Sequence, residues 1–284
     1  MSAFEKTKTF ILDTLFPISC LSCGAGNAWL CANCLQKMQI FSFQVCPKCE
    51  RFIIDSGRLC QACKRSSLKN KDFFLDAMLV AAKYKENDLS KILHFYKYNL
   101  IQDIHIPLGR IMTKTFLDND LPLPDLIVPV PLHKRRLRWR GFNQSELLAN
   151  YISENLTPGM EIPVFNDLLI RKKHTTPQMK VRKYSERKEN IKDAFALNSV
   201  CPVIPVPVFA RINSSEIQSS GLDSGSKAGM TKNYLLKNKR ILLVDDVATT
   251  GATLNECAKI LKLAGAKKVF GIVLARQEWD KKTI

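Results

Sequence analysis

The stretch ILLVDDVATTGAT, residues 241–253, decides the fold of this chain. Four apolar residues predict a buried strand, and two adjacent acids, Asp245 and Asp246, open the loop that follows it. Small and hydroxylated residues fill the rest of the loop, and Thr253 is suited to cap a helix. A strand that delivers two carboxylates into such a turn can bind vicinal sugar hydroxyls or a hydrated Mg²⁺.

The residues after this stretch complete a βαβ unit. An apolar helix pattern covers residues 254–261, Gly265 is a suitable helix stop, and residues 269–274 predict the returning strand. Ligands of such units bind beyond the carboxyl ends of the strands, where the amides at a helix N-terminus can surround a phosphate. The groups available for this are those of Thr249, Thr250, Gly251 and Thr253. The alternative is an ordinary strand-to-helix turn with exposed acids.

The preceding residues repeat the alternation of strand and helix. Strands are predicted over residues 75–84 and 126–130, and helices over residues 92–96, 108–117 and 143–156. This order predicts an α/β fold in which helices cover a parallel sheet.

Eight of the ten cysteines form four CxxC pairs between residues 20 and 63. Two such pairs can complete a tetrahedral site, so the sequence predicts two structural zinc sites. The alternative is a disulfide framework, which needs an oxidising compartment, and we expect no signal peptide here. Alternating pairing would interleave the two sites. We expect sequential pairing instead, with Cys20, Cys23, Cys31 and Cys34 in one site and Cys46, Cys49, Cys60 and Cys63 in the other.

Two domains are expected. Residues 1–70, with an N-terminal helix, would form a double zinc ribbon that metal binding stabilises, because so small a module lacks a sufficient core. Residues 71–284 would form the α/β domain. Within it the composition shifts to Pro, Ser and Gly between residues 199 and 233, which predicts a flexible surface insertion.

The composition excludes several classes of protein. Of the 284 residues, 46% are hydrophobic and 24% are charged, which is typical of a folded globular protein. The longest apolar runs fall far short of the roughly 20 residues that a membrane helix needs. We therefore expect no membrane span and a cytoplasmic location.

The net charge of +17 is concentrated in one part of the chain. Residues 133–192 contain 14 Lys and Arg against six Asp and Glu. Within this part, Arg138, Arg140 and Trp139 combine phosphate-binding cations with an aromatic surface on which a base can stack. A solvated basic surface is the alternative.

Three motifs carry a resemblance to known families. Residues 241–253 resemble the phosphoribosyl pyrophosphate (PRPP) motif of type I phosphoribosyltransferases, four apolar residues followed by DDxxTTGxT. The CxxC pairs, VPVPLHKRRLRWRGFNQSELLA at residues 128–149 and RKKHTTPQMKVRKYSERKENIKDAF at residues 171–195 are similar to the ComF family of late-competence proteins. The most specific mark is RGFNQ at residues 140–144. The resemblance implies a type I phosphoribosyltransferase fold with a small N-terminal zinc-ribbon module.

The resemblance also implies site residues. Asp245 and Asp246 would hold the ribose hydroxyls of PRPP, and they would be the catalytic acids of an enzyme. The 5′-phosphate would be wrapped by Ala248, Thr249, Thr250, Gly251, Ala252 and Thr253. The pyrophosphate, which Mg²⁺ would also neutralise, would meet a loop after the 126–130 strand and a flexible loop at residues 171–190. The residues concerned are Pro131, Leu132, Arg135, Arg136, Arg171, Lys172 and Lys173.

Three functions follow from the resemblance. The first is a PRPP-binding protein that acts in DNA uptake during natural transformation, with single-stranded DNA, a competence helicase or a recombination mediator as partners. The second is an active, Mg²⁺-dependent phosphoribosyltransferase that transfers ribose 5-phosphate to a nitrogen nucleophile, such as a base in nucleotide salvage. The third is a nucleic-acid adaptor with a vestigial sugar-phosphate loop. The sequence favours the first and leaves turnover open.

Overall fold

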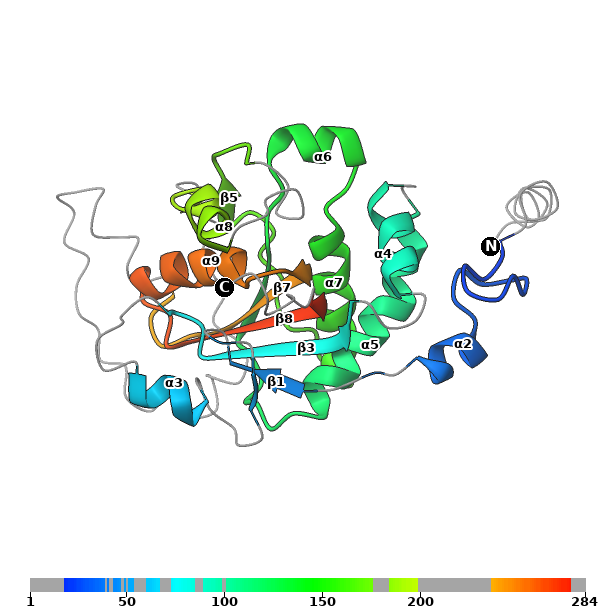
Figure 1. Ribbon diagram of the computed structural model, residues 1–284, viewed down its shortest axis with the longest axis horizontal. Coiled ribbons are helices and arrows are strands. Elements are labelled where there is room, and N and C mark those ends of the chain that lie inside the picture. Colours follow the sequence, from blue (N-terminus) through cyan, green and yellow to red (C-terminus); the bar gives the residue numbers. More distant parts are fainter. Residues whose placement is uncertain are drawn as a thin grey trace.

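The computed structural model describes residues 18–38, 40, 43–46, 49, 51–53, 60–66, 73–84, 89–98, 101–175, 184–198 and 236–276. These residues form an α/β fold with helices on both faces of a six-stranded sheet (Figure 1). The N-terminal helix and the 199–233 insertion expected from the sequence lie outside the described residues, as do residues 176–183 of the expected flexible loop. No helix in the described part is long and apolar enough to cross a membrane.

Four neighbouring strands of the sheet run parallel, in the order β3, β8, β7 and β4, with β4 at the edge. β8 (Lys268–Arg276) lies between β3 (Ala77–Lys83) and β7 (Arg240–Ala248), and β4 (Leu126–Pro129) pairs with the other edge of β7. Almost all residues of β4 and β8 are buried, because helices cover both faces of this part of the sheet. The predicted parallel sheet and its βαβ unit are confirmed.

Alternating residues of β7 contribute to two halves of the core. Leu242 and Val244 belong to one buried cluster, and Ile241 and Leu243 belong to the other. The first cluster includes α4 (Leu89–Tyr98), α5 (His105–Leu117), which a short 3₁₀ helix (Gln102–Ile104) precedes, and α7 (Gln144–Leu156). The second includes α8 (Tyr184–Ile191), α9 (Ala252–Leu263) and a small antiparallel sheet of β5 (Leu169–Arg171) and β6 (Phe195–Leu197).

Two short strands extend the sheet from the cysteine-rich part of the chain. β1 (Phe43–Val45) pairs antiparallel with β3, and β2 (Phe52–Ile53) pairs with β1. α3 (Gln61–Ser66) follows, whereas α2 (Ala32–Lys37) lies at the other end of the molecule in Figure 1. Strands from both sides of residue 70 thus share one sheet, and the domain boundary expected there stays a prediction.

The βαβ unit differs from its predicted bounds in two ways. β7 continues to Ala248 because its pairing with β8 continues, so Asp245 and Asp246 belong to the strand and not to a loop. α9 begins at Ala252 with Gly251 as its N-cap, so Thr253 lies inside the helix and does not cap it. Gly251 has φ 67°, a conformation that favours glycine.

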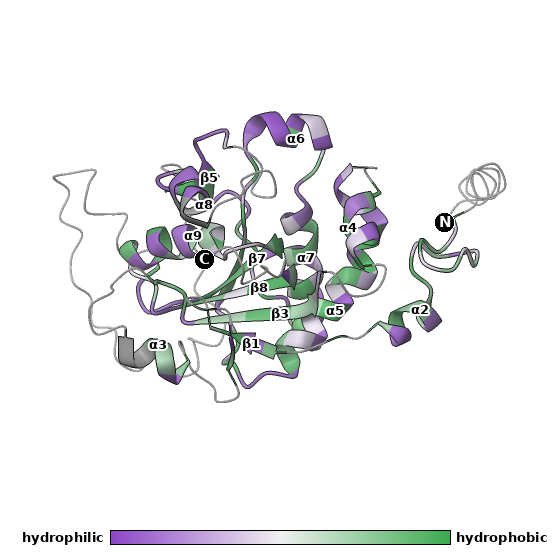
Figure 2. Cartoon of the chain, in the orientation of Figure 1, coloured by the Kyte–Doolittle hydropathy of each residue, from purple (hydrophilic) through white to green (hydrophobic). Residues whose placement is uncertain are grey.

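The basic segment before α7 forms a helix that the sequence pattern does not predict, α6 (Lys134–Arg140). The His133 side chain accepts a hydrogen bond from the Arg135 N–H at its start, and Gly141 ends it at φ 74°. Figure 2 shows that α6 is mostly hydrophilic, in contrast to the apolar central strands.

Candidate functional site

A pocket lies at the carboxyl ends of β4 and β7, where parallel sheets of this kind bind ligands. One part of its lining comes from residues 245–254, which run from the end of β7 into α9 and which we call the acid wall. The rest comes mainly from α4, α6, α7 and β5. We call its polar residues the basic wall: Lys97, Tyr98, Arg136, Arg140, Gln144, Ser145 and Arg171.

Asp245 is held by the start of α7. The Ser145 hydroxyl donates a hydrogen bond to Asp245 Oδ1 at 3.0 Å, and the Asp246 backbone N–H donates to the same oxygen at 2.9 Å. Asn143 fixes this end of α7, because its side chain accepts from the Ser145 N–H and donates to the Val130 carbonyl. The RGFNQ motif thus connects the end of β4 to the acid wall.

Burial raises the pKa of the Asp245 carboxyl to about 7, and the neighbouring Asp246 carboxylate acts in the same direction. The Lys97 ammonium, the Asp246 N–H and the Ser145 hydroxyl favour the ionised form but do not outweigh these effects. Near neutral pH, Asp245 therefore exchanges between a form that only accepts hydrogen bonds and a form that can also donate one.

Asp246 forms an ion pair with the basic wall. Lys97 Nζ lies 3.0 Å from Asp246 Oδ1, and both side chains are largely buried. Lys97 comes from the last turn of α4, almost 150 residues before its partner. This contact brings a cation next to the carboxylate that the sequence assigns to the ribose.

The turn between β7 and α9 presents buried polar groups. Thr249 and Thr250 are both buried, and the Thr250 hydroxyl accepts from the Ala252 N–H. At the end of β8, Arg276 Nε donates to the Thr249 carbonyl at 3.4 Å. The first N–H groups of a helix have no partner within the helix, so this end of α9 can accept an anion.

Two arginines of the basic wall meet at Thr175. Arg136 donates to the Thr175 carbonyl at 2.8 Å, and Arg171 donates to the Thr175 hydroxyl. Burial lowers the pKa of both guanidinium groups, and nearby arginines add to this, so that Arg171 has a pKa of about 10. Both stay charged at neutral pH, and no carboxylate in the described part of the chain forms an ion pair with either. Such a pair is suited to bind an anion.

The pocket includes some of the residues expected from the sequence and not others. It is lined by Asp245, Asp246, Ala248, Thr249, Gly251, Thr253, Pro131, Leu132, Arg136, Arg140 and Arg171. The residues outside its lining are Thr250, Ala252, Arg135, Arg138, Trp139, Lys172 and Lys173. The last five of these side chains are exposed.

Four residues of the basic wall were not assigned to the site by the sequence: Lys97, Tyr98, Gln144 and Ser145. Gln144 ends the RGFNQ motif and Ser145 follows it, so the motif itself was the signal for these two. Lys97 and Tyr98 carried no such signal, because only the packing of α4 brings them to the pocket.

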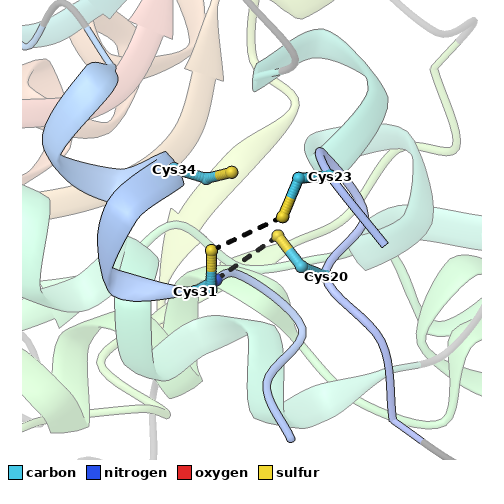
Figure 3. Close-up of side chains that lie close together, drawn as sticks. All are labelled: Cys20, Cys23, Cys31 and Cys34. Atoms are coloured by element: carbon cyan, nitrogen blue, oxygen red, sulfur yellow. Dashed lines mark hydrogen bonds between the residues drawn. The ribbon is translucent and has the colours of Figure 1, made fainter. Parts of the chain in front are cut away.

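The eight CxxC cysteines form two clusters, and their sequential pairing is confirmed. The sulfur atoms of each cluster lie within 4.8 Å of one another, and Figure 3 shows those of the first pointing together. The Sγ atoms of Cys23 and Cys31 are 3.7 Å apart, and those of Cys49 and Cys60 are 3.4 Å apart. A tetrahedral zinc with Zn–S bonds of about 2.3 Å separates its sulfurs by roughly 3.8 Å. Both clusters therefore fit structural zinc sites.

Backbone N–H groups surround the Cys20 sulfur. Burial alone would raise the pKa of its thiol, but backbone N–H groups, with that of Cys31 first, outweigh burial and lower it to about 6. The Cys31 N–H donates to Cys20 Sγ, with an N···S distance of 3.4 Å.

Known proteins share both parts of this architecture. The double zinc ribbon domain family matches residues 11–65, and the phosphoribosyl transferase domain family matches residues 148–283. Competence protein F of Haemophilus influenzae is 30% identical over 270 residues, which cover 92% of this chain and 98% of that protein. DNA utilization protein YhgH of Escherichia coli is 26% identical, with coverage of 86% and 94%, and Competence protein ComFC of Bacillus subtilis is 25% identical, with 87% and 84%.

Proposed function

The chain belongs to the family of Competence protein F, and on this premise we propose that it binds PRPP in the pocket and acts in DNA uptake. One observation carries the proposal. The pocket combines a pair of carboxylates, a helix N-terminus and arginines without carboxylate partners in the described structure. A ribose with a phosphate on one side and a pyrophosphate on the other needs these three kinds of group.

Each part of PRPP has a complementary group in the pocket. Asp245 and Asp246 would accept hydrogen bonds from the ribose hydroxyls, which would share Asp246 with Lys97. The turn at Thr249 to Thr253 would surround the 5′-phosphate, where the N-terminus of α9 favours negative charge. Arg136 and Arg171 would meet the pyrophosphate.

Magnesium fits this pocket as a companion of the ligand. Mg²⁺ prefers oxygen ligands and is commonly held by substrate phosphates and waters rather than by a complete protein cage. When bound, it would neutralise part of the pyrophosphate charge. The Arg136 and Arg171 side chains would stabilise the rest, in binding as in any departure of pyrophosphate from C1 of the ribose.

The role in DNA uptake rests on the relatives and on α6. The relatives are named as competence and DNA utilization proteins. On α6, Arg138 and Trp139 are exposed and lie outside the pocket lining, and Arg140 belongs to the lining. We assign these residues to contact with single-stranded DNA, with a competence helicase or a recombination mediator as protein partners.

Calorimetric titration with PRPP and Mg²⁺ tests the proposal. We expect heat from the wild type and a loss of affinity of about 100-fold or more for Asp245→Asn with Asp246→Asn, because charged hydrogen bonds each contribute roughly 1.5–3 kcal/mol. Asp120→Asn, which changes an exposed acid outside the pocket lining, should bind as the wild type does. No heat from the wild type would refute PRPP binding. Pyrophosphate release over a panel of bases would show whether the protein is also a transferase.

A further inference from the structure

Two exposed aromatic rings lie side by side at the edge of the pocket. Tyr98, at the end of α4, and Trp139, on α6, have ring centroids 5.8 Å apart and an interplanar angle of 61°. Tyr98 is 44% exposed and Trp139 is 61% exposed. The exposed His94 ring lies 4.6 Å from the Tyr98 ring and extends the group. We call His94, Tyr98 and Trp139 the aromatic platform.

The platform is continuous with the pocket through Arg140. The Arg140 guanidinium lies over the Tyr98 ring, with Cζ 5.6 Å from the ring centroid, and it donates to Gln144 Oε1 at 3.0 Å. Tyr98 and Arg140 both line the pocket, whereas Trp139 does not. Because the Tyr98 and Trp139 rings are inclined at 61°, a planar group stacked on the face of one ring would meet the edge of the other, and it would lie at the mouth of the PRPP site.

The cations of α6 divide into two sets. Arg136 and Arg140, four residues apart and so on one helix face, line the pocket. The other cations, Lys134, Arg135 and Arg138, are exposed and lie outside the lining. A ligand confined to the pocket cannot neutralise this second set. The exposed cations of α6, a mostly hydrophilic helix (Figure 2), are thus available to a larger polyanion.

We infer that an unpaired base of single-stranded DNA stacks on the aromatic platform at the mouth of the PRPP pocket, while the exposed cations of α6 contact the adjacent phosphates. A free base could use the rings but has no phosphates for the cations, and duplex DNA offers phosphates but keeps its bases stacked. Aromatic side chains beside a cationic surface are the usual means of binding single strands. The inference rests on the proposed role in DNA uptake for the choice of DNA.

Fluorescence anisotropy with two labelled oligonucleotides tests the stacking. One is an oligothymidylate of about 15 nucleotides, and the other is an abasic strand of the same length and charge. We expect Trp139→Ala and Tyr98→Ala each to lower the affinity for oligothymidylate by roughly tenfold. The affinity for the abasic strand should change little, because stacking needs the base. Leu137→Ala, another exposed apolar side chain of α6, is the matched control and should bind as the wild type does.

Two results would overturn the inference. One is equal binding of the two oligonucleotides by the wild type, and the other is unchanged binding of oligothymidylate by both aromatic variants. Trp139→Phe should recover most of the affinity that Trp139→Ala loses, which an effect on folding alone would not explain. PRPP titration of the same samples separates the proposals: absence of PRPP heat refutes PRPP binding only, and PRPP heat without base-dependent DNA binding refutes the platform only.

Discussion

The two walls of the pocket are built in different ways. The acid wall is one continuous segment, residues 245–254, in which strand pairing with β8 and the first turn of α9 hold the backbone. The basic wall is assembled from separate elements, and side-chain contacts such as those of Arg136 and Arg171 with Thr175 fix its groups. One wall therefore has its geometry set by main-chain structure, and the other depends on individual side chains.

The walls also have opposite electrostatic needs. Burial and a neighbouring carboxylate raise the pKa of Asp245, whereas burial and a neighbouring guanidinium lower the pKa of Arg171. Each wall thus holds like charges close together, and the Lys97–Asp246 ion pair and the Ser145–Asp245 hydrogen bond connect the walls directly. A ligand with hydroxyls at one end and an anion at the other would offset the repulsion between like charges in both walls. The walls should accordingly recognise different parts of PRPP.

Removal of Arg136 and Arg171, both partly buried, should have the largest effect on this comparison. In Arg136→Met with Arg171→Met, we expect PRPP affinity to fall about 100-fold or more, because each charged hydrogen bond contributes roughly 1.5–3 kcal/mol. The affinity for ribose 5-phosphate, which lacks the pyrophosphate, should fall little. Calorimetry with both ligands measures the difference.

A matched control is Lys172→Met with Lys173→Met, which removes the same charge at two exposed positions directly after Arg171. We expect this pair to change PRPP affinity by about threefold or less, since exposed charges act through screened solvent. If the lysine variant loses more PRPP affinity than the arginine variant, the pyrophosphate binds outside the pocket lining. The proposal that the basic wall recognises the pyrophosphate is then wrong.

Loss of the Thr175 hydroxyl should have a smaller effect of the same kind. Thr175→Val removes the acceptor for Arg171 but keeps the carbonyl that accepts from Arg136. We expect PRPP affinity to fall by about tenfold and ribose 5-phosphate affinity to stay unchanged, because only the position of Arg171 is disturbed. Thr175→Ser keeps a hydroxyl and should retain wild-type affinity. An equal loss for both ligands would indicate a general change in folding instead.

The acid wall could be predicted from the sequence because all its information is local. Apolar residues, two acids, a small-residue turn and a helix pattern follow one another in residues 241–253. The main error in this prediction was the end of β7, which the sequence pattern places at Val244. Asp and Gly are depleted in strands, but pairing with β8 overrides that preference as far as Ala248.

The basic wall could be predicted only in part. The sequence shows that residues 133–142 are basic. Without a predicted helix there, however, it could not distinguish the pocket-lining Arg136 and Arg140 from the exposed Arg135 and Arg138. A helix makes that separation, since residues four apart share a face. Lys97 could not be found at all, because its place depends on how α4 packs against the sheet.

The raised pKa of Asp245 predicts that the stability of the protein depends on pH. The folded carboxyl has a pKa of about 7, whereas the unfolded one titrates near its ordinary value of 3.8. Between these values the folded state binds more protons, so the free energy of unfolding should fall as pH rises from about 4 to 7 and level off above 7. Thermal unfolding across this range should show this decrease of stability with pH, and Asp245→Asn should make the decrease smaller. Asp120→Asn, the exposed control, should leave the decrease unchanged. If Asp245→Asn also left it unchanged, the pH dependence would come from other groups.

The smallest effect on the pocket should come from the zinc sites, even where the effect on stability is large. Cys46 directly follows β1, which pairs with β3 at the edge of the main sheet, whereas Cys20 belongs to the cluster beside α2. We expect Cys46→Ser and Cys20→Ser each to release about one zinc per chain, and Cys46→Ser to lower the melting temperature of the protein more than Cys20→Ser does.

The PRPP affinity of the folded fraction should change by less than about twofold in both variants, because neither cluster supplies a residue to either wall. Zinc analysis, thermal unfolding and calorimetry on the same samples measure the three quantities. A loss of PRPP binding in Cys46→Ser below its melting temperature would show that the edge of the sheet, and not only the local turn after β7, holds the acid wall in place.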